Sequence, residues 1–121
     1  MSLTATEPIG LVPPTQEGRA VLAKFYRALG DPSRLALLAF IAQGERTGSE
    51  CVEFLGLAQS RVSAHLACLV TCGFVATRRE ARFTRYAVRD PRVLELVRLG
   101  ADLASDNAAA VAACMRVGPP A

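Results

Sequence analysis

The sequence has one histidine, His65, and no long apolar run, and each shortage excludes a class of protein. With one histidine we find no combination of nucleophile, base and orienting residue, so the sequence does not predict an enzyme. Apolar segments, such as residues 35–42, fall far short of the roughly 20 residues of a membrane span. The N-terminal residues lack the basic and apolar regions of a signal peptide. We therefore expect a cytoplasmic protein without a membrane partner.

The composition is that of one small domain. The chain has 121 residues, of which 51% are hydrophobic and 21% are charged, which suffices for a single buried core. A net charge of +3 permits binding to nucleic acid without requiring it. Because a cytoplasmic protein is kept reduced, its four cysteines are expected to be free thiols and not a disulfide framework.

The residue pattern divides the chain into three parts. Residues 1–14 contain three prolines and little periodicity, which predicts a flexible N-terminal arm. Residues 15–107 form the folded domain, and residues 108–121 form a C-terminal tail whose Ala-rich start is expected to extend the last helix. The helices of the domain are predicted from apolar residues at helical spacing, at residues 15–29, 32–43, 49–55 and 59–72, and from residue 91 onward.

Turn and cap residues fix how these helices are joined. Asp31-Pro32 and Asp90-Pro91 are typical helix starts, because Asp caps the first turn and Pro suits its first position. A helix, a glycine turn at Gly56 and a second helix make a helix-turn-helix pattern. Two alternating segments rich in β-forming residues, 74–80 and 82–88, then predict a β-hairpin. The expected fold is mainly α with this small hairpin, a winged helix-turn-helix.

Two cysteines, Cys68 and Cys72, lie one helical turn apart in the second helix of the helix-turn-helix. The alternative is that each is only a small buried hydrophobe. The helical phase predicts instead that they share the exposed stripe that would touch DNA. That stripe also contains Arg61 and Ala64, and the opposite core face contains Val62, Leu66, Leu69 and Val70.

Four motifs in order, LGDPSRLALL, LGLAQSRVSAHLACL, CGFV and RFTRYAV, resemble the ArsR/SmtB family of metal-responsive winged-helix repressors. The resemblance covers about residues 20–97, and VSAHLACLVTCG is most similar to the cadmium- and lead-sensing CmtR branch. It implies a homodimer that binds operator DNA and a metal site formed by Cys68, Cys72 and Cys114. Two departures stand out: Ala58 replaces the usual Ser or Thr cap of the recognition helix, and Glu80-Ala81 replaces the usual wing-tip glycine.

The ligand inventory limits which metal such a site can hold. The last helix offers Asp102 and Asp106 but no histidine, so it lacks the zinc site that is common there in this family. The first helix of the helix-turn-helix has only Cys51, so it lacks the other metal site that is common in the family. An all-thiolate site favours soft ions such as Cd(II), Pb(II) or Hg(II), whereas structural zinc prefers four ligands. Cys51 falls at an inward-facing helical position, in phase with Leu55, and is interpreted as core packing.

Candidate DNA contacts occupy the recognition helix and the hairpin. Polar residues near the start of the helix are suited to base edges in the major groove, and hairpin arginines to phosphates or the minor groove. A solvated cationic hairpin is the alternative. For His65, a backbone or phosphate contact is expected before metal ligation, and neither is expected before simple structural packing. The candidates are Gln59, Ser60, Arg61, Ser63, Ala64, His65, Arg78, Arg79, Arg82 and Arg85.

The last helix carries an apolar stripe that is too hydrophobic to lie exposed, which predicts a dimer interface. It consists of Val93, Leu96, Val97, Gly100 and Leu103.

The predicted function is a homodimeric repressor that releases its operator when a soft metal ion binds, with no organic cofactor. The alternative is a thiol-based redox or persulfide sensor on the same fold. A disulfide between Cys68 and Cys72 would distort their helix, because their side chains are nearly parallel and one turn apart.

Overall fold

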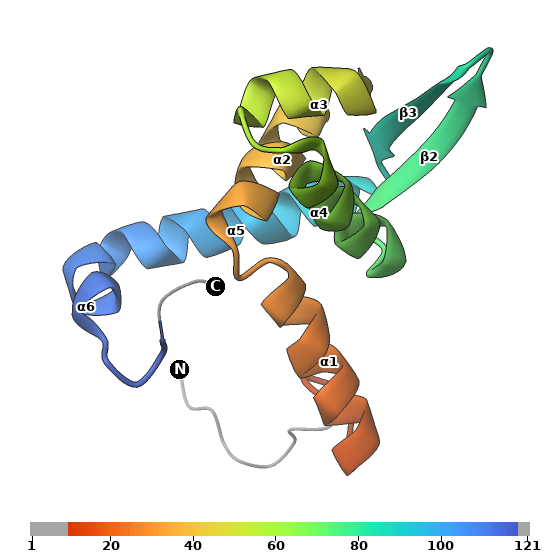
Figure 1. Ribbon diagram of the computed structural model, residues 1–121. Coiled ribbons are helices and arrows are strands. Elements are labelled where there is room, and N and C mark those ends of the chain that lie inside the picture. The colour runs from red at the N-terminus through yellow and green to blue at the C-terminus, as the bar shows by residue number, and fades with distance from the viewer. Residues whose placement is uncertain (1–9, 119–121) are drawn as a thin grey trace.

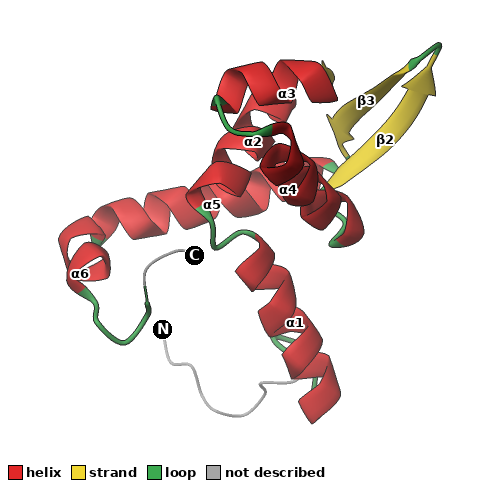
Figure 2. Ribbon diagram, viewed as in Figure 1, coloured by secondary structure: helices red, strands yellow, loops and turns green. Residues whose placement is uncertain are grey.

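The computed structural model describes residues 10–118 and shows a mainly helical chain with one small antiparallel sheet (Figures 1 and 2). This confirms the predicted fold class. Most of the predicted arm, residues 1–9, and the end of the tail, residues 119–121, lie outside the described residues. The elements are α1 (Gln16–Ala28), α2 (Pro32–Ala42), β1 (Arg46–Thr47), α3 (Gly48–Leu55), α4 (Gln59–Thr71), β2 (Val75–Glu80), β3 (Phe83–Val88), α5 (Pro91–Asp106) and α6 (Ala108–Ala113).

The two Asp-Pro starts form as expected. The side chain of Asp31 accepts a hydrogen bond from the backbone N–H of Arg34 at 3.0 Å, and that of Asp90 accepts from Arg92 at 2.8 Å. Each following proline occupies the first turn, where the missing N–H costs nothing. Both helices therefore begin where the sequence predicts.

The core is formed by the centre of the chain. Side chains from α2, α3, α4 and the start of β2 pack together around Phe74, and the largest of them are completely or almost completely buried. Full burial of an aliphatic side chain contributes about 1.5–3 kcal/mol. The residues are Leu37, Leu38, Ile41, Cys51, Val62, Leu66, Leu69, Phe74 and Val75.

The sheet has the strand order β1-β3-β2, and β2 and β3 form the predicted hairpin. The short strand β1 was not predicted, because two residues are too few for an alternating pattern. At the wing tip Ala81 adopts φ 55, the left-handed region that glycine favours. The hairpin thus keeps its tight turn without the family's usual glycine.

The helices α1 and α5 extend away from this centre in different directions (Figure 1). Phe25 of α1 packs on Phe74 with ring centroids 4.6 Å apart, but most of α1 beyond it is exposed. Helix α5 ends at Asp106, and after Asn107 the chain forms a separate short helix, α6. The expectation that residues 108–114 continue the last helix is therefore wrong.

The apolar stripe of α5 divides into two parts. Val93 is buried in the core of its own chain, and Leu96 and Val97 pack against that core. These three residues of the predicted dimer interface therefore already have a partner within their own chain. Only the distal part is left uncovered: Gly100 is exposed, and Leu103 is 61% exposed.

Candidate nucleic-acid interface and thiol pair

A short helix and a tight turn hold the recognition helix α4 in place. Helix α3 begins with reciprocal hydrogen bonds: Thr47 N–H donates to Glu50 Oε1 at 2.8 Å, and Glu50 N–H donates to Thr47 Oγ1 at 3.2 Å. It ends at Gly56, whose φ of 68 is left-handed. Cys51 has 0% exposure, and burial raises the pKa of its thiol to about 11. Its predicted core position is confirmed.

The start of α4 presents its polar side chains to solvent. Within the described residues no side chain caps this helix, as the sequence predicts from Ala58. The predicted DNA contacts on this helix, apart from His65, are all exposed; they are Gln59, Ser60, Arg61, Ser63 and Ala64. Their exposure is consistent with the predicted role.

An open groove of about 390 Å³ separates α3 and α4 from the hairpin. Gln59 and Ser63 line it on the helix side, and Arg82 and Thr84 line it on the hairpin side. The start of the recognition helix and the wing therefore face the same groove.

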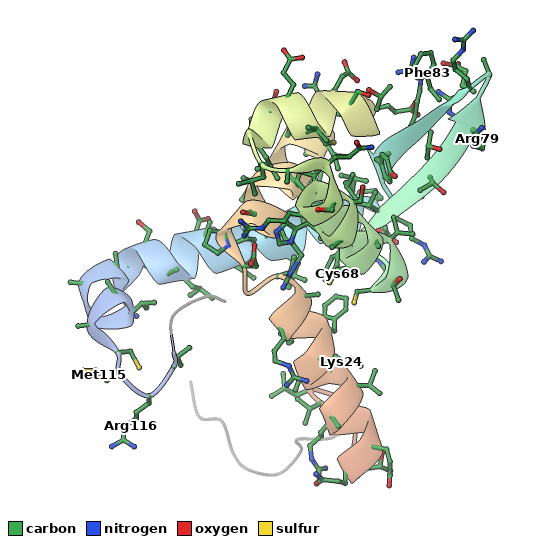
Figure 3. All side chains as sticks on the ribbon, in the orientation of Figure 1. Lys24, Cys68, Arg79, Phe83, Met115 and Arg116 are labelled. Carbon is green, nitrogen blue, oxygen red and sulfur yellow. The ribbon has the colours of Figure 1, made fainter. Side chains whose placement is uncertain are left out.

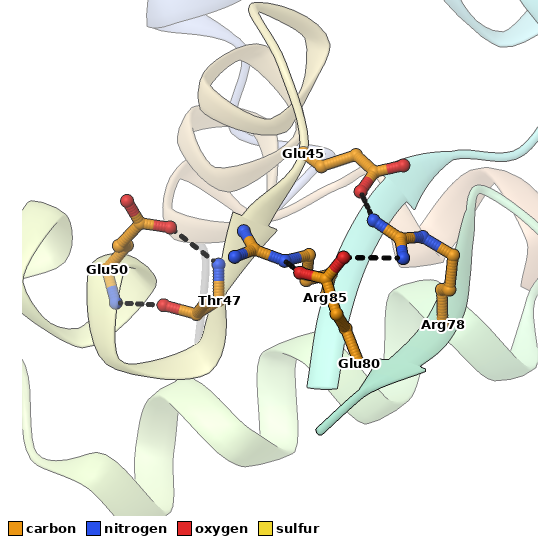
Figure 4. A network of polar contacts seen from close by, with 6 residues as sticks. All are labelled: Glu45, Thr47, Glu50, Arg78, Glu80 and Arg85. Carbon is orange, nitrogen blue, oxygen red and sulfur yellow. Dashed lines mark hydrogen bonds and ion pairs between the residues drawn. The ribbon is translucent and has the colours of Figure 1, made fainter. Parts of the chain in front are cut away.

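The four wing arginines have different environments. Arg79 donates to Thr84 Oγ1 at 3.0 Å, and Arg82 lines the groove. Arg78 and Arg85 instead form ion pairs with acidic residues (Figure 4). Sequence reasoning gave all four the same role and missed the acidic partners.

The thiol pair does not lie on the exposed stripe of α4. Cys68 and Cys72 are half-buried and pack against the core cluster, so the expectation that they share the exposed DNA-facing stripe is wrong. They occupy the flank of α4 that faces α1, where Figure 3 shows Cys68. The exposed stripe consists instead of Ser60, Ser63, Ala64, Ala67 and Thr71.

The electrostatics of this flank act on the thiols in opposite directions. Burial raises the pKa of Cys72, and so do the negative charge of Cys68 and a hydrogen bond with it. The positive charges of Lys24 and Arg34 act to lower it. The two sulfurs are close enough for a hydrogen bond, and both cations favour the ionised form of Cys72. Lys24 and Arg34 come from other helices, so no pattern within α4 points to them.

His65 lies on the same flank and is half-buried. Its Nδ1 is 3.4 Å from Arg34 Nη1, and Arg34 Nε donates to the Ala28 carbonyl at 2.6 Å. Burial acts to raise the pKa of Asp31, but its hydrogen bond from Arg34 and the charges of Arg34 and His65 leave it lowered. These contacts favour the packing interpretation of His65 and make Arg34 a junction between α1, α2 and α4.

Cys114 is exposed and follows α6. Figure 3 shows its neighbour Met115 at the distal end of the α5–α6 arm, away from Cys68. Between residues 10 and 118 of one chain, no group of three His, Cys, Asp or Glu side chains could hold a metal ion. One chain therefore brings together two of the three predicted ligands.

The helices in the described part of the chain are all too short or too polar to cross a membrane.

Comparisons with known proteins agree with this architecture. The family model for bacterial regulatory proteins of the arsR family matches residues 31–77. The chain is 58% identical over 95 residues to the probable mercury resistance operon repressor of Streptomyces lividans, a match that covers 78% of this chain and 76% of that protein. It is 41% identical over 71 residues to the HTH-type transcriptional regulator CmtR of Mycobacterium tuberculosis, covering 59% of this chain and 60% of that protein.

Solved structures show the same fold. One is a homodimeric winged helix-turn-helix DNA-binding domain from Mycobacterium bovis, a possible ArsR-family regulator. It matches with a TM-score of 0.68 and 26% identity, over 88% of this chain and 92% of that one. NolR from Sinorhizobium fredii matches with a TM-score of 0.66 and 26% identity, over 75% of this chain and 94% of that one. The winged helix-turn-helix prediction is confirmed.

Proposed function

The chain belongs to the ArsR family of bacterial regulatory proteins and is a transcriptional repressor of that family, and from this premise we propose that it is a metal sensor. In this proposal a homodimer binds operator DNA through α4 and the wing. It releases the operator when a soft metal ion binds to Cys68 and Cys72. The observation that carries the proposal is the pair of half-buried thiols on the flank of the recognition helix, next to two cations.

The thiol pair is chemically suited to a soft ion. A thiolate, not a thiol, is the metal ligand, so binding requires loss of both protons. The raised pKa of Cys72 keeps its proton on at neutral pH, while Lys24 and Arg34 reduce the cost of removing it. A bound divalent cation supplies the charge that offsets two thiolates. Metal affinity should therefore increase with pH.

The number of thiols brought together favours Hg(II) among the candidate ions. Hg(II) binds well to two thiolates, whereas Cd(II) and Pb(II) need a third soft ligand. Similarity to a probable mercury resistance repressor supports the same ion. The resemblance to the CmtR branch supports Cd(II) and Pb(II), with Cys114 as the third ligand. Because Cys114 lies away from Cys68 in one chain, we propose that it would come from a second copy.

Coupling to DNA follows from the position of the thiols. Arg34 connects the last turn of α1 to the flank of α4 that carries the thiols, so a change at the thiols acts on the orientation of α4 relative to α1. Release requires the metal to bind the DNA-free form more tightly. A difference of about 1.4 kcal/mol gives each tenfold loss of operator affinity.

The test is a metal titration of the operator-bound protein under reducing conditions, followed by fluorescence anisotropy. Hg(II) is expected to release the operator from the wild type and from Cys51→Ser, but not from Cys68→Ser or Cys72→Ser. Cys114→Ser should lose the response to Cd(II) and Pb(II) and keep that to Hg(II). Release by peroxide or polysulfide, with no response to any of these ions, would favour the redox alternative instead.

A further inference from the structure

The outer face of the wing carries a compact group of four charged residues, here called the wing ion network: Glu45, Arg78, Glu80 and Arg85 (Figure 4). Arg85 Nε donates to Glu80 Oε1 at 2.6 Å, and Arg78 Nη1 donates to Glu80 Oε2 at 3.2 Å. Arg78 Nη2 also donates to Glu45 Oε1, in the segment just before β1. Glu80 therefore holds both arginines with its two oxygens.

Strand register explains why an acid is needed at this position. Arg78 and Arg85 are direct partners across β2 and β3, so their side chains point to the same face. Two like charges directly opposite one another destabilise a hairpin. Glu80 lies two residues after Arg78 and shares its face, and the two guanidiniums hold the pKa of its carboxyl below the usual value. It is ionised at neutral pH.

The network divides the wing into a neutral face and a cationic face. Two arginines and two glutamates give the network no net charge. Arg79 directly follows Arg78, so its side chain points to the opposite face of the hairpin, as does that of its cross-strand partner Thr84. Thr84 lines the groove beside α4. Of the four ion pairs among the described residues, none involves Arg79 or Arg82. The positive charge of the wing that no acidic residue pairs with therefore belongs to Arg79 and Arg82.

We propose that Glu80 sets the electrostatic strength of DNA binding, because it keeps Arg78 and Arg85 from DNA phosphates and so weakens binding to duplexes of any sequence. This inference rests on the proposed function, because it presupposes that the wing contacts DNA. Binding to arbitrary sequence is almost entirely a matter of phosphate contacts. Glu80 thus lowers both the affinity for DNA and its dependence on salt concentration.

The test measures affinity for a random-sequence duplex over a range of salt concentrations. Glu80→Gln removes the one acid of Arg85 and one of the two acids of Arg78, so it should steepen the log–log salt slope by about 0.9 to 1.8, which is roughly 0.9 per contact. The gain in affinity over wild type should then shrink by up to roughly tenfold between about 50 and 200 mM salt. Affinity for an operator selected in vitro with the wild type should rise by a similar factor, because phosphate contacts carry no sequence information.

Two controls isolate the network from the change in net charge. Glu17→Gln makes the same charge change on the exposed first turn of α1, and should leave the slope almost unchanged. Glu45→Gln also removes one of the two acids of Arg78 but leaves Arg85 paired with Glu80, so it should steepen the slope less than Glu80→Gln does. These ion pairs are largely exposed and contribute little to folding, so the variants should stay folded.

A double-mutant cycle completes the experiment. In a background of Arg78→Gln and Arg85→Gln, Glu80→Gln should have no more effect than Glu17→Gln. A full effect in that background would mean that the carboxylate repels DNA directly, and would overturn the proposal. So would a Glu80→Gln slope equal to that of Glu17→Gln while the wild type binds DNA. A wild type that binds neither duplex would overturn the proposed function as well.

Discussion

The centre of the molecule and its two helical arms differ in how completely they bury their apolar side chains. The centre, α2 to β3, contains almost all of the buried side chains and needs no second chain to cover them. The arms, α1 and α5–α6, bury only Ala28 and Val93, close to where each meets the centre. Farther out they carry large apolar side chains that are more than half exposed, namely Val21, Tyr26, Leu99, Leu103 and Val111, whereas Leu35, Phe54 and Phe83 of the centre are 40%, 47% and 49% exposed.

This difference indicates a division of roles. A large apolar side chain left in water gains about 1.5–3 kcal/mol when it is covered. The centre is therefore built to fold and read DNA, and the arms are built to meet another surface, which in the proposed function is a second copy. The thiol pair lies at the boundary, on a helix of the centre and beside Lys24 of an arm.

The largest effect is expected from a cavity in the centre. Leu69→Ala removes a completely buried side chain and should lower the free energy of unfolding by about 2–5 kcal/mol. Leu103→Ala, the matched change in an arm, should lower it by less than about 1 kcal/mol in dilute protein, because Leu103 is 61% exposed. Urea denaturation at low protein concentration measures both. Equal losses would remove the distinction between centre and arms.

The next largest effect concerns assembly. Leu99→Asp with Leu103→Asp should give folded monomers, because neither residue belongs to the core. Loss of joint reading of two half-sites should weaken operator binding on the order of 100-fold. Sedimentation and circular dichroism report the two properties separately. A dimer that survives both charges would move the interface to α1, where Val21→Asp is the variant to make next.

A smaller but sharper effect is expected at the boundary. Cys72→Ser should bind the operator as the wild type does in the absence of metal. The factor by which metal lowers operator affinity should be at least tenfold smaller in the variant than in the wild type, a difference of about 1.4 kcal/mol. Because the pKa of Cys72 is raised, the metal concentration needed by the wild type should fall as the pH increases from about 6 to 8. Cys51→Ser is the control, since Cys51 lies inside the centre. A metal response without pH dependence would exclude ligands that must lose a proton.

The smallest effect tests which face of the wing belongs to the DNA-reading centre. Arg79→Ala with Arg82→Ala should flatten the log–log salt slope of DNA binding by about 1.8. Arg78→Ala with Arg85→Ala should change it much less, because both arginines are already paired with acids. Anisotropy titrations at several salt concentrations compare the pairs. The opposite ranking would assign the phosphate contacts to the outer face.

Local features were predictable because nearby residues determine them. Asp-Pro pairs, Gly56, and the alternation of residues 74–80 and 82–88 place the helices and the hairpin within one or two residues. The burial of Cys51 follows from the same helical phase that buries Leu55 in part. In each case the information lies within one turn or one strand.

The errors share a different cause. Helical phase says which way Cys68 and Cys72 point from their own axis, but not that α1 lies beside that flank. Likewise helical phase identifies the apolar stripe of α5. It does not show that the first half of the stripe packs on a centre formed by residues far away in the sequence. The pair of Glu45 and Arg78 spans 33 positions, so no local pattern contains it. Contacts between distant segments determine these parts of the site.

Because Cys51 is buried, the rate at which its thiol reacts reports how often the centre of the protein opens. Its sulfur has no exposed surface and its pKa is raised to about 11, so a thiol-specific alkylating reagent cannot modify it at neutral pH until the centre opens. Cys114 is exposed and should be modified at the intrinsic rate. The ratio of the two labelling rates, followed by mass spectrometry, gives the free energy of opening of the centre under native conditions. Comparing that ratio with and without operator DNA would show whether bound DNA holds the centre closed.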